Sequence, residues 1–480
     1  RHVRPDSFLP RMCYFENTYL GGNAAYEERL RRLDEDFGRK GPYRMASLPP
    51  QPFDAPDDAG LSLSAALDTR WLDQPGRVYL QIGLQGSTRY GWRRPPLDVA
   101  LVVDPAARAA DAEALTTAVT TLVRRLGPQD RLAVVLAEAR PVVLSELASV
   151  RDVRLALAHT LDSPPAPGAS DGASMAAALD TAGVVLRRGA QDQARVPGTQ
   201  TVVLVTHGAS DDRVEAATVA AHALSVAGAV TSVIQIGGER GRWWSVANAG
   251  NGNYHRGDLE PSIEAELESL SKVIARLLRI NVRLAPNVQA VRVIGSRVLG
   301  QAEVRQVKDR EEATDRNLSR TLGVKADRGD DDDGVQTVIP YFYGGDAHVI
   351  LLELWVDQPG PVADITLKYK DMVALDNATS RASVAVTRLP RPETPEQRIV
   401  LRNVRGFTLA EVLGQAADAA DRGATAQAEA LLGRARDRAQ GADARLLDGL
   451  REATRARGAQ RMAEALRMAS ARRVGQPSRR

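Results

Sequence analysis

Residues 97–108 have the sequence Leu-Asp-Val-Ala-Leu-Val-Val-Asp-Pro-Ala-Ala-Arg. The almost wholly apolar run 97–103 is typical of a strand that is covered on both faces in a parallel sheet. Residues 111–126 then place Leu115, Val119 and Leu122 on one helical stripe. Further strands are expected at 132–137, 201–206 and 230–236, and helices at 150–161, 173–187, 212–226 and 261–278. This alternation predicts a doubly wound α/β domain with right-handed crossovers over residues 96–280.

Hydrophobic residues alternate with polar ones on both sides of this region. Period-two segments occur at 61–65 and 78–84 before it, and at 282–284, 291–293, 335–339, 349–356 and 365–367 after it. We therefore predict that residues 61–95 and 281–390 form one β-rich, sandwich-like domain into which the α/β domain is inserted.

The two ends of the chain differ from the middle. Residues 1–60 form an N-terminal extension, with a helix expected at 24–37 and a Pro-rich linker at 47–60. Residues 397–480 form an Ala-rich helical segment, interrupted at Gly423, Gly441 and Gly458, in which two or three helices are expected to pack as hairpins.

Composition excludes several classes of partner. The 480 residues include 63 basic and 60 acidic side chains, so the net charge is only +3 and gives no strong field for nucleic acid. No apolar run reaches the ~18 residues of a membrane span. The single cysteine, Cys13, excludes a disulfide framework within the chain.

Three loops should meet beyond the carboxyl ends of the parallel strands, where open α/β sheets bind their ligands. These loops are residues 104–108, 168–172 and 206–210. The candidate binding residues in them are Asp104, Arg108, Ser170, Asp171, His207 and Ser210.

Two stretches carry a family resemblance. They are Asn-Ala-Gly-Asn-Gly-Asn-Tyr at 248–254, and Arg-Val-Tyr-Leu-Gln-Ile-Gly-Leu at 77–84, which leads through Pro95 and Pro96 to the first parallel strand. With them the chain resembles the von Willebrand factor type A family over roughly residues 61–372. The similarity is to bacterial members related to calcium-activated chloride channel proteins. The resemblance implies a protein-binding function and a place in the bacterial cell envelope, with the cytoplasm as the alternative.

Family members that bind a metal use an Asp-x-Ser-x-Ser motif, a Thr from the second loop and an Asp from the third. Mg²⁺ and Ca²⁺ require such oxygen ligands. In this sequence Asp104 matches the first carboxylate, but Ala106 and Arg108 replace the two serines and His207 replaces the third-loop Asp. We therefore predict a degenerate metal-ion-dependent adhesion site with no metal and no cofactor. An ion pair of Asp104 with Arg108 or His207 would take the place of the cation.

Three alternatives use the same residues. Asp104, Ser170 and water could retain a divalent ion in a metal-dependent adhesion protein. Asp104, Ser170 and His207 are the residue types of a hydrolase triad, although no nucleophile elbow surrounds Ser170. Asp104, His207 and His255 could hold Zn²⁺, although they lack close ligand spacing.

Two other features have alternative interpretations. Trp243 and Trp244 are either an exposed contact patch or core residues. The acidic run 330–333 lacks the ligand spacing of an EF-hand and indicates a solvated hairpin or a disordered loop. Taken together, the sequence predicts a non-enzymatic interaction or scaffold protein that contacts other subunits of a bacterial assembly.

Overall fold

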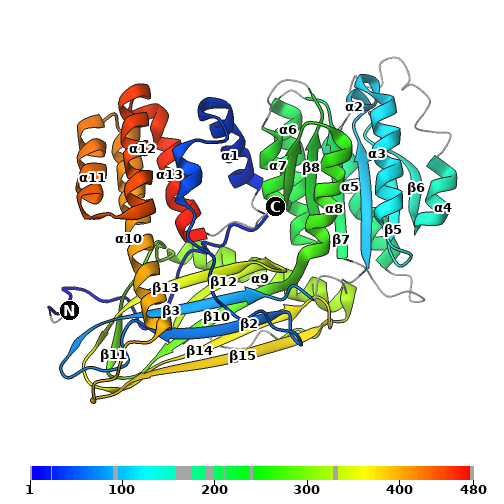
Figure 1. Ribbon diagram of the computed structural model, residues 1–480. Helices are drawn as coiled ribbons and strands as arrows, with labels where there is room; N and C mark the ends of the chain where they lie inside the picture. The colour runs from blue at the N-terminus through cyan, green and yellow to red at the C-terminus, as the bar shows by residue number, and fades with distance from the viewer. Residues whose placement is uncertain are drawn as a thin grey trace.

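The computed structural model describes residues 3–22, 24–89, 96–157, 174–190, 199–208, 211–237, 242–327 and 333–475. These residues form three neighbouring units (Figure 1). Two mostly antiparallel sheets lie along one side of the molecule. An α/β unit and a helical bundle stand side by side on them, with α1 between the two (Figure 1).

The α/β unit is built on a six-stranded sheet with the order β6-β5-β4-β7-β8-β9. All neighbouring strands are parallel except β6, which runs antiparallel to β5. The strands are β4 (Leu97–Val103), β5 (Arg131–Leu136), β6 (Val142–Ser149), β7 (Thr199–Thr206), β8 (Val230–Gln235) and β9 (Asn251–Arg256). The predicted doubly wound α/β class is therefore confirmed.

Helices cover both faces of this sheet, which explains the apolar character of β4 and β5. One face packs against α5 (Met175–Ala190), α6 (Asp211–Val226) and α7 (Trp243–Ala249). The other packs against α3 (Ala112–Arg125), α4 (Val150–Leu157) and α8 (Leu259–Lys272). The short helix α2 (Pro105–Ala110) follows β4 directly.

Strands from both flanks of the α/β unit pair with one another. One sheet has the order β1-β12-β10-β14-β15 and the other the order β11-β13-β3-β2, and residues of both contribute to a common core. Their bounds are β1 (Cys13–Tyr14), β2 (Leu61–Leu67), β3 (Gly76–Gly86), β10 (Val273–Leu284), β11 (Val288–Val293), β12 (Val335–Tyr343), β13 (Ala347–Val356), β14 (Gly360–Asp371) and β15 (Asp376–Val386).

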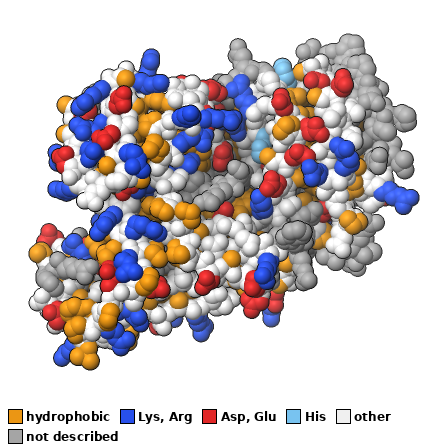
Figure 2. Space-filling model, viewed as in Figure 1, with side chains coloured by type: hydrophobic (Ala, Val, Ile, Leu, Met, Phe, Trp, Pro, Cys, Tyr) orange, Lys and Arg blue, Asp and Glu red, His pale blue; other side chains and the backbone are white. Residues whose placement is uncertain are grey.

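Helices form the third unit and fill the gaps between units. These helices are α1 (Ala24–Phe37), the 3₁₀ helix η1 (Pro42–Ala46), α9 (Gln301–Leu322), α10 (Pro395–Asp421), α11 (Thr425–Arg438), α12 (Gly441–Arg457) and α13 (Ala459–Gly475). Tyr26, Leu30 and Leu33 of α1 pack in one core with α10 to α13. The face in Figure 2 is hollowed between the three units, and Lys and Arg side chains gather at the upper rim of the hollow.

The helix predicted at 261–278 is shorter than expected. It ends at Lys272, and Val273 begins β10. Apolar residues such as Ile274 and Leu278 suit either period, but here the backbone of β10 pairs with β12 on one side and β14 on the other. A register shift at 276–279 accommodates Leu277 at φ 50°.

The C-terminal segment contains four helices, where two or three were expected. The three glycines do separate helices, because Gly423, Gly441 and Gly458 have φ values of 74°, 58° and 79°. An L side chain at such angles costs free energy, whereas glycine does not, so each glycine lets the chain turn from one helix into the next. In the described part of the chain, none of the helices combines the length and the apolar character that a membrane crossing requires.

Candidate binding surface at the end of the parallel sheet

Asp104 is positioned by the end of β4 and the start of α2. It is the N-cap of α2, where its Oδ1 accepts a hydrogen bond of 2.9 Å from the backbone N–H of Ala106. Pro105 follows at the first helical position, where its missing N–H costs nothing. An Asp-Pro sequence after a buried strand thus begins a helix and fixes the direction of the carboxylate.

The second carboxylate oxygen of Asp104 is held by the neighbouring strand β7. Its Oδ2 accepts a hydrogen bond of 2.7 Å from the hydroxyl of Thr206 and one of 3.4 Å from the backbone N–H of His207. Only 1% of Asp104 is exposed. The carboxylate therefore ties the β4 and β7 loops together from within the protein.

Among the described residues, the Asp104 carboxylate does not form the expected ion pair with the side chain of a neighbouring cation. Its donors in the described part of the chain are two backbone N–H groups and one hydroxyl, and none is a guanidinium or imidazole. Arg108 is buried one turn further along α2. The ring of His207 lies against Gly237, where a Cβ would come within 2.8 Å of Nε2.

The structure does not describe all of the other predicted site residues. Ser170, Asp171 and Ser210 lie outside the described residues, as does the acidic run 330–332. Among the residues that the structure describes, no group of three or more His, Cys, Asp or Glu side chains is placed to hold a metal. The zinc interpretation is not supported by His255, which hydrogen-bonds to Glu266 at 2.8 Å.

Glu266 is a buried centre that the sequence analysis did not identify. It accepts hydrogen bonds from Ser232 Oγ at 2.6 Å, Asn253 Nδ2 at 3.0 Å and His255 Nε2 at 2.8 Å. Burial alone would raise the pKa of this carboxyl, but the hydrogen bonds, above all that of His255, hold the pKa below its ordinary 4.5. These contacts join β8, β9 and α8.

Residues 248–254 are the part of the sequence that could have indicated this hydrogen-bond network around Glu266. It forms the end of α7 and most of β9, a strand that was not predicted. A Cβ on Gly252 would lie only 2.2 Å from the carbonyl oxygen of Thr231, so glycine is required for β9 to approach β8. The glycines explain the close approach, and Asn253 supplies a donor to Glu266.

The two tryptophans have different surroundings. Trp243 is fully buried in the core under α5 and α6, so its interpretation as a contact residue is wrong. Trp244 is partly buried and packs against the same core. The first tryptophan stabilises the α/β unit, and its ring is not available to a partner.

The sequence matches no protein-family model and no curated protein. Among solved structures, it is similar to von Willebrand factor type A from Catenulispora acidiphila, with 14% identity and a TM-score of 0.47 over 81% of this chain and 88% of that one. It is also similar to the ArnB paralog VWA2 from Sulfolobus acidocaldarius, with 13% identity and a TM-score of 0.41 over 87% of this chain and 99% of that one. The conserved hypothetical protein BatB from Bacteroides thetaiotaomicron is 17% identical, with a TM-score of 0.28 over 37% of this chain and 97% of that one. With TM-scores below 0.5, these similarities assign no function to the chain.

Proposed function

We propose that this protein is a non-enzymatic binding or scaffold protein, whose α/β unit is of the von Willebrand factor type A kind and contacts another protein without a divalent cation. The contact surface is the end of the parallel sheet around α2 and the β4 and β7 loops. The observation that carries the proposal is the hydrogen bonding of Asp104, which is buried and accepts three donors from its own loops.

The residues around Asp104 support a site without metal. Mg²⁺ and Ca²⁺ need several oxygen ligands, but Ala106 offers none and Arg108 brings a positive charge into the same helical turn. Two of the lone pairs on Asp104 that a cation would use are occupied by Thr206 and the backbone of Ala106. A positive ion would therefore have to displace contacts that already stabilise the loops.

The arrangement of Asp104 and His207 supports the absence of enzymatic activity. In a hydrolase triad the acid accepts a hydrogen bond from the histidine ring and orients it. Here Asp104 accepts from the backbone N–H of His207 instead. The imidazole would need another orienting group before it could act as a general base.

Calorimetric titration with Mg²⁺, Mn²⁺ and Ca²⁺ tests the metal-free part of the proposal. We expect no saturable heat with up to 10 mM of each ion at pH 7, a limit set at roughly ten times a millimolar Kd. An Asp104→Ala variant is the matched control, since any heat of nonspecific binding should be the same in both proteins. Saturable binding that this substitution removes would support the metal-dependent adhesion alternative.

Capture of a partner from the native cell tests the binding surface. Ala110 is exposed at the end of α2, and Ala110→Arg should prevent capture of the partner. Val219→Arg is the control, because Val219 is 68% exposed on the flank of α6. Capture should be equal with Mg²⁺ and with EDTA. If capture of the partner were lost in EDTA and restored by Mg²⁺, this would contradict binding without a cation. If both variants captured the partner equally well, this would contradict the proposed position of the contact surface.

We also propose that the protein acts in the bacterial cell envelope, on the basis of the family resemblance of residues 77–84 and 248–254. The experiment is fractionation of the native cell with an antibody against this chain. Recovery with periplasmic or surface markers is expected. Recovery only with cytoplasmic markers would contradict this localisation and would leave the proposed binding surface to be judged by partner capture.

A further inference from the structure

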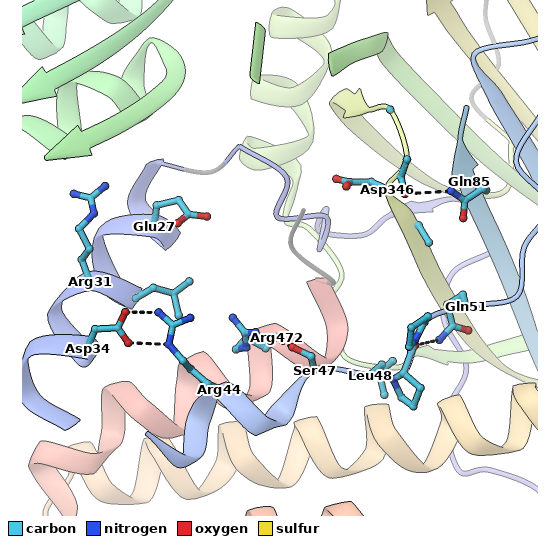
Figure 3. Close-up of a pocket in the computed structure, with 16 residues that line it drawn as sticks. Glu27, Arg31, Asp34, Arg44, Ser47, Leu48, Gln51, Gln85, Asp346 and Arg472 are labelled. Atoms are coloured by element: carbon cyan, nitrogen blue, oxygen red, sulfur yellow. Dashed lines mark hydrogen bonds and ion pairs between the residues drawn. The ribbon is translucent and has the colours of Figure 1, made fainter. Parts of the chain in front are cut away.

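A cavity of 680 Å³ lies where α1, η1, residues 47–51, β3, the turn at 344–347 and α13 meet (Figure 3). It is remote in the chain from Asp104 and shares none of the residues of that surface. Its volume is within the range of about 300–1,000 Å³ of small-molecule sites. Its walls carry six charged side chains: Glu27, Arg31, Asp34, Arg44, Asp346 and Arg472.

Several of these charged groups are already engaged with one another or with the protein. Arg44 donates to both carboxylate oxygens of Asp34. Burial alone would raise the pKa of Asp34, but the hydrogen bonds from Arg44 and Tyr43 lower it. Arg31 pairs with Glu28 and donates to the carbonyl oxygen of Tyr254. The contacts of Arg31, Asp34 and Arg44 thus fix the wall of the cavity.

Arg472 is a cation in this cavity without an acidic partner. Its Nη2 donates to Ser47 Oγ at 2.8 Å, and its Nε is buried with no hydrogen-bond acceptor. No carboxylate in the described part of the chain lies within ion-pair distance of its guanidinium. Burial raises the pKa of the nearby Tyr26 hydroxyl, although the charge of Arg472 and a hydrogen bond with it lower that pKa, so the hydroxyl remains neutral. The positive charge of Arg472 is therefore not neutralised by the protein.

Glu27 is the corresponding anion. It lies on α1 and forms no ion pair with a Lys or Arg among the described residues. Figure 3 shows Glu27 and Asp346 reaching toward each other from opposite walls, with Arg472 and Ser47 on the adjacent wall. Gln85 lies beside Asp346 on the same wall, and its Nε2 donates to the carbonyl oxygens of Gly86 and Gly345 (Figure 3).

We propose that this cavity binds a zwitterionic oligopeptide. The C-terminal carboxylate pairs with Arg472 and accepts from Ser47, while the N-terminal ammonium pairs with Glu27. A planar guanidinium matches a carboxylate with two parallel hydrogen bonds, which makes such a contact both strong and directional. Free amino acids carry the same two groups, but the cavity is several times larger than an alanine, so a peptide fills it better.

Calorimetry with four probes tests the ligand chemistry. Trialanine should bind with a Kd in the micromolar to millimolar range. N-acetyl-trialanine, which lacks the ammonium, and trialanine amide, which lacks the carboxylate, should each bind about tenfold or more weakly, as expected for losing one charge-assisted contact. Free alanine tests whether the ligand is a free amino acid or a peptide, since both carry an ammonium and a carboxylate. Tighter binding of alanine than of trialanine would overturn the peptide assignment.

Variants assign each end of the peptide to its residue. Arg472→Gln should weaken trialanine about tenfold and leave trialanine amide unchanged, whereas Glu27→Gln should weaken trialanine and leave N-acetyl-trialanine unchanged. The matched controls are Arg461→Gln and Asp36→Asn, exposed residues of α13 and α1. Comparing two probes on one variant separates a lost contact from a damaged fold. No binding of trialanine at 10 mM, or equal losses for both probes, would overturn the proposal.

Discussion

At the scale of single residues, a buried carboxylate is most sensitive to the removal of its charge. Glu266→Gln keeps the size of the side chain but places an amide where Ser232, Asn253 and His255 all approach an acceptor. We expect the free energy of unfolding at pH 7 to fall by about 2–4 kcal/mol. Urea unfolding measures this. Glu268→Gln on the exposed side of α8 should change it by about 0.5 kcal/mol or less.

The lowered pKa of Glu266 predicts that the free energy of unfolding depends on pH. Because the pKa of Glu266 is lower in the folded protein than its ordinary 4.5, its contribution to stability is present above that value. It is lost as the pH falls through the folded-state pKa. The wild type should therefore lose more stability than Glu266→Gln between pH 6 and about pH 3, as measured by urea unfolding at each pH. Parallel pH profiles would contradict the assigned pKa direction.

At the scale of elements, α9 is attached to the sheet by buried charge. Lys370 of β14 is fully buried and lies 2.7 Å from both Asp315 of α9 and Asp327. Lys370→Met removes this cation from the buried Asp315 and from the partly exposed Asp327, which keeps Arg279 as a partner. We expect a loss of about 3–5 kcal/mol in thermal or urea unfolding, together with faster amide exchange in α9.

Two comparisons make this prediction specific. The double variant Lys370→Met with Asp315→Asn should recover part of the lost stability, since it removes one of the uncompensated charges. Arg305→Met on the exposed face of α9 should change stability by about 0.5 kcal/mol or less. If Lys370→Met behaved like Arg305→Met, the ion cluster would not be what attaches α9.

At the scale of the whole molecule, α1 connects the α/β unit to the helical bundle. Its Arg31 donates to the carbonyl oxygen of Tyr254 in β9 and lies 4.7 Å from the centre of that ring. Arg31→Ala should weaken the contact between the two units by about 1–2 kcal/mol. The expected result is faster amide exchange in β9 and α1, with α10 unchanged. Arg39→Ala, an exposed residue just after α1, should leave the exchange of all three elements unchanged.

The sequence by itself determined the α/β class, because the apolar runs of β4, β5, β7 and β8 and the helical stripes between them depend on local periodicity. It also determined α1, whose predicted bounds match the structure. It placed Asp104 at a strand end but did not reveal its hydrogen-bond donors, since the hydrogen bond from Thr206 depends on β7 lying beside β4. Backbone donors leave no signature in a sequence.

Tertiary structure alone decided the end of α8, the helix α9, the fourth C-terminal helix and the cavity beside Arg472. Val273–Leu284 has apolar residues at spacings that suit a helix or a strand, and pairing with two other strands selects the strand. The hydrophilic helix α9 is held by cations of β10 and β14 that lie far away in the chain. Such contacts arise only after distant segments meet, so local patterns could not reveal them.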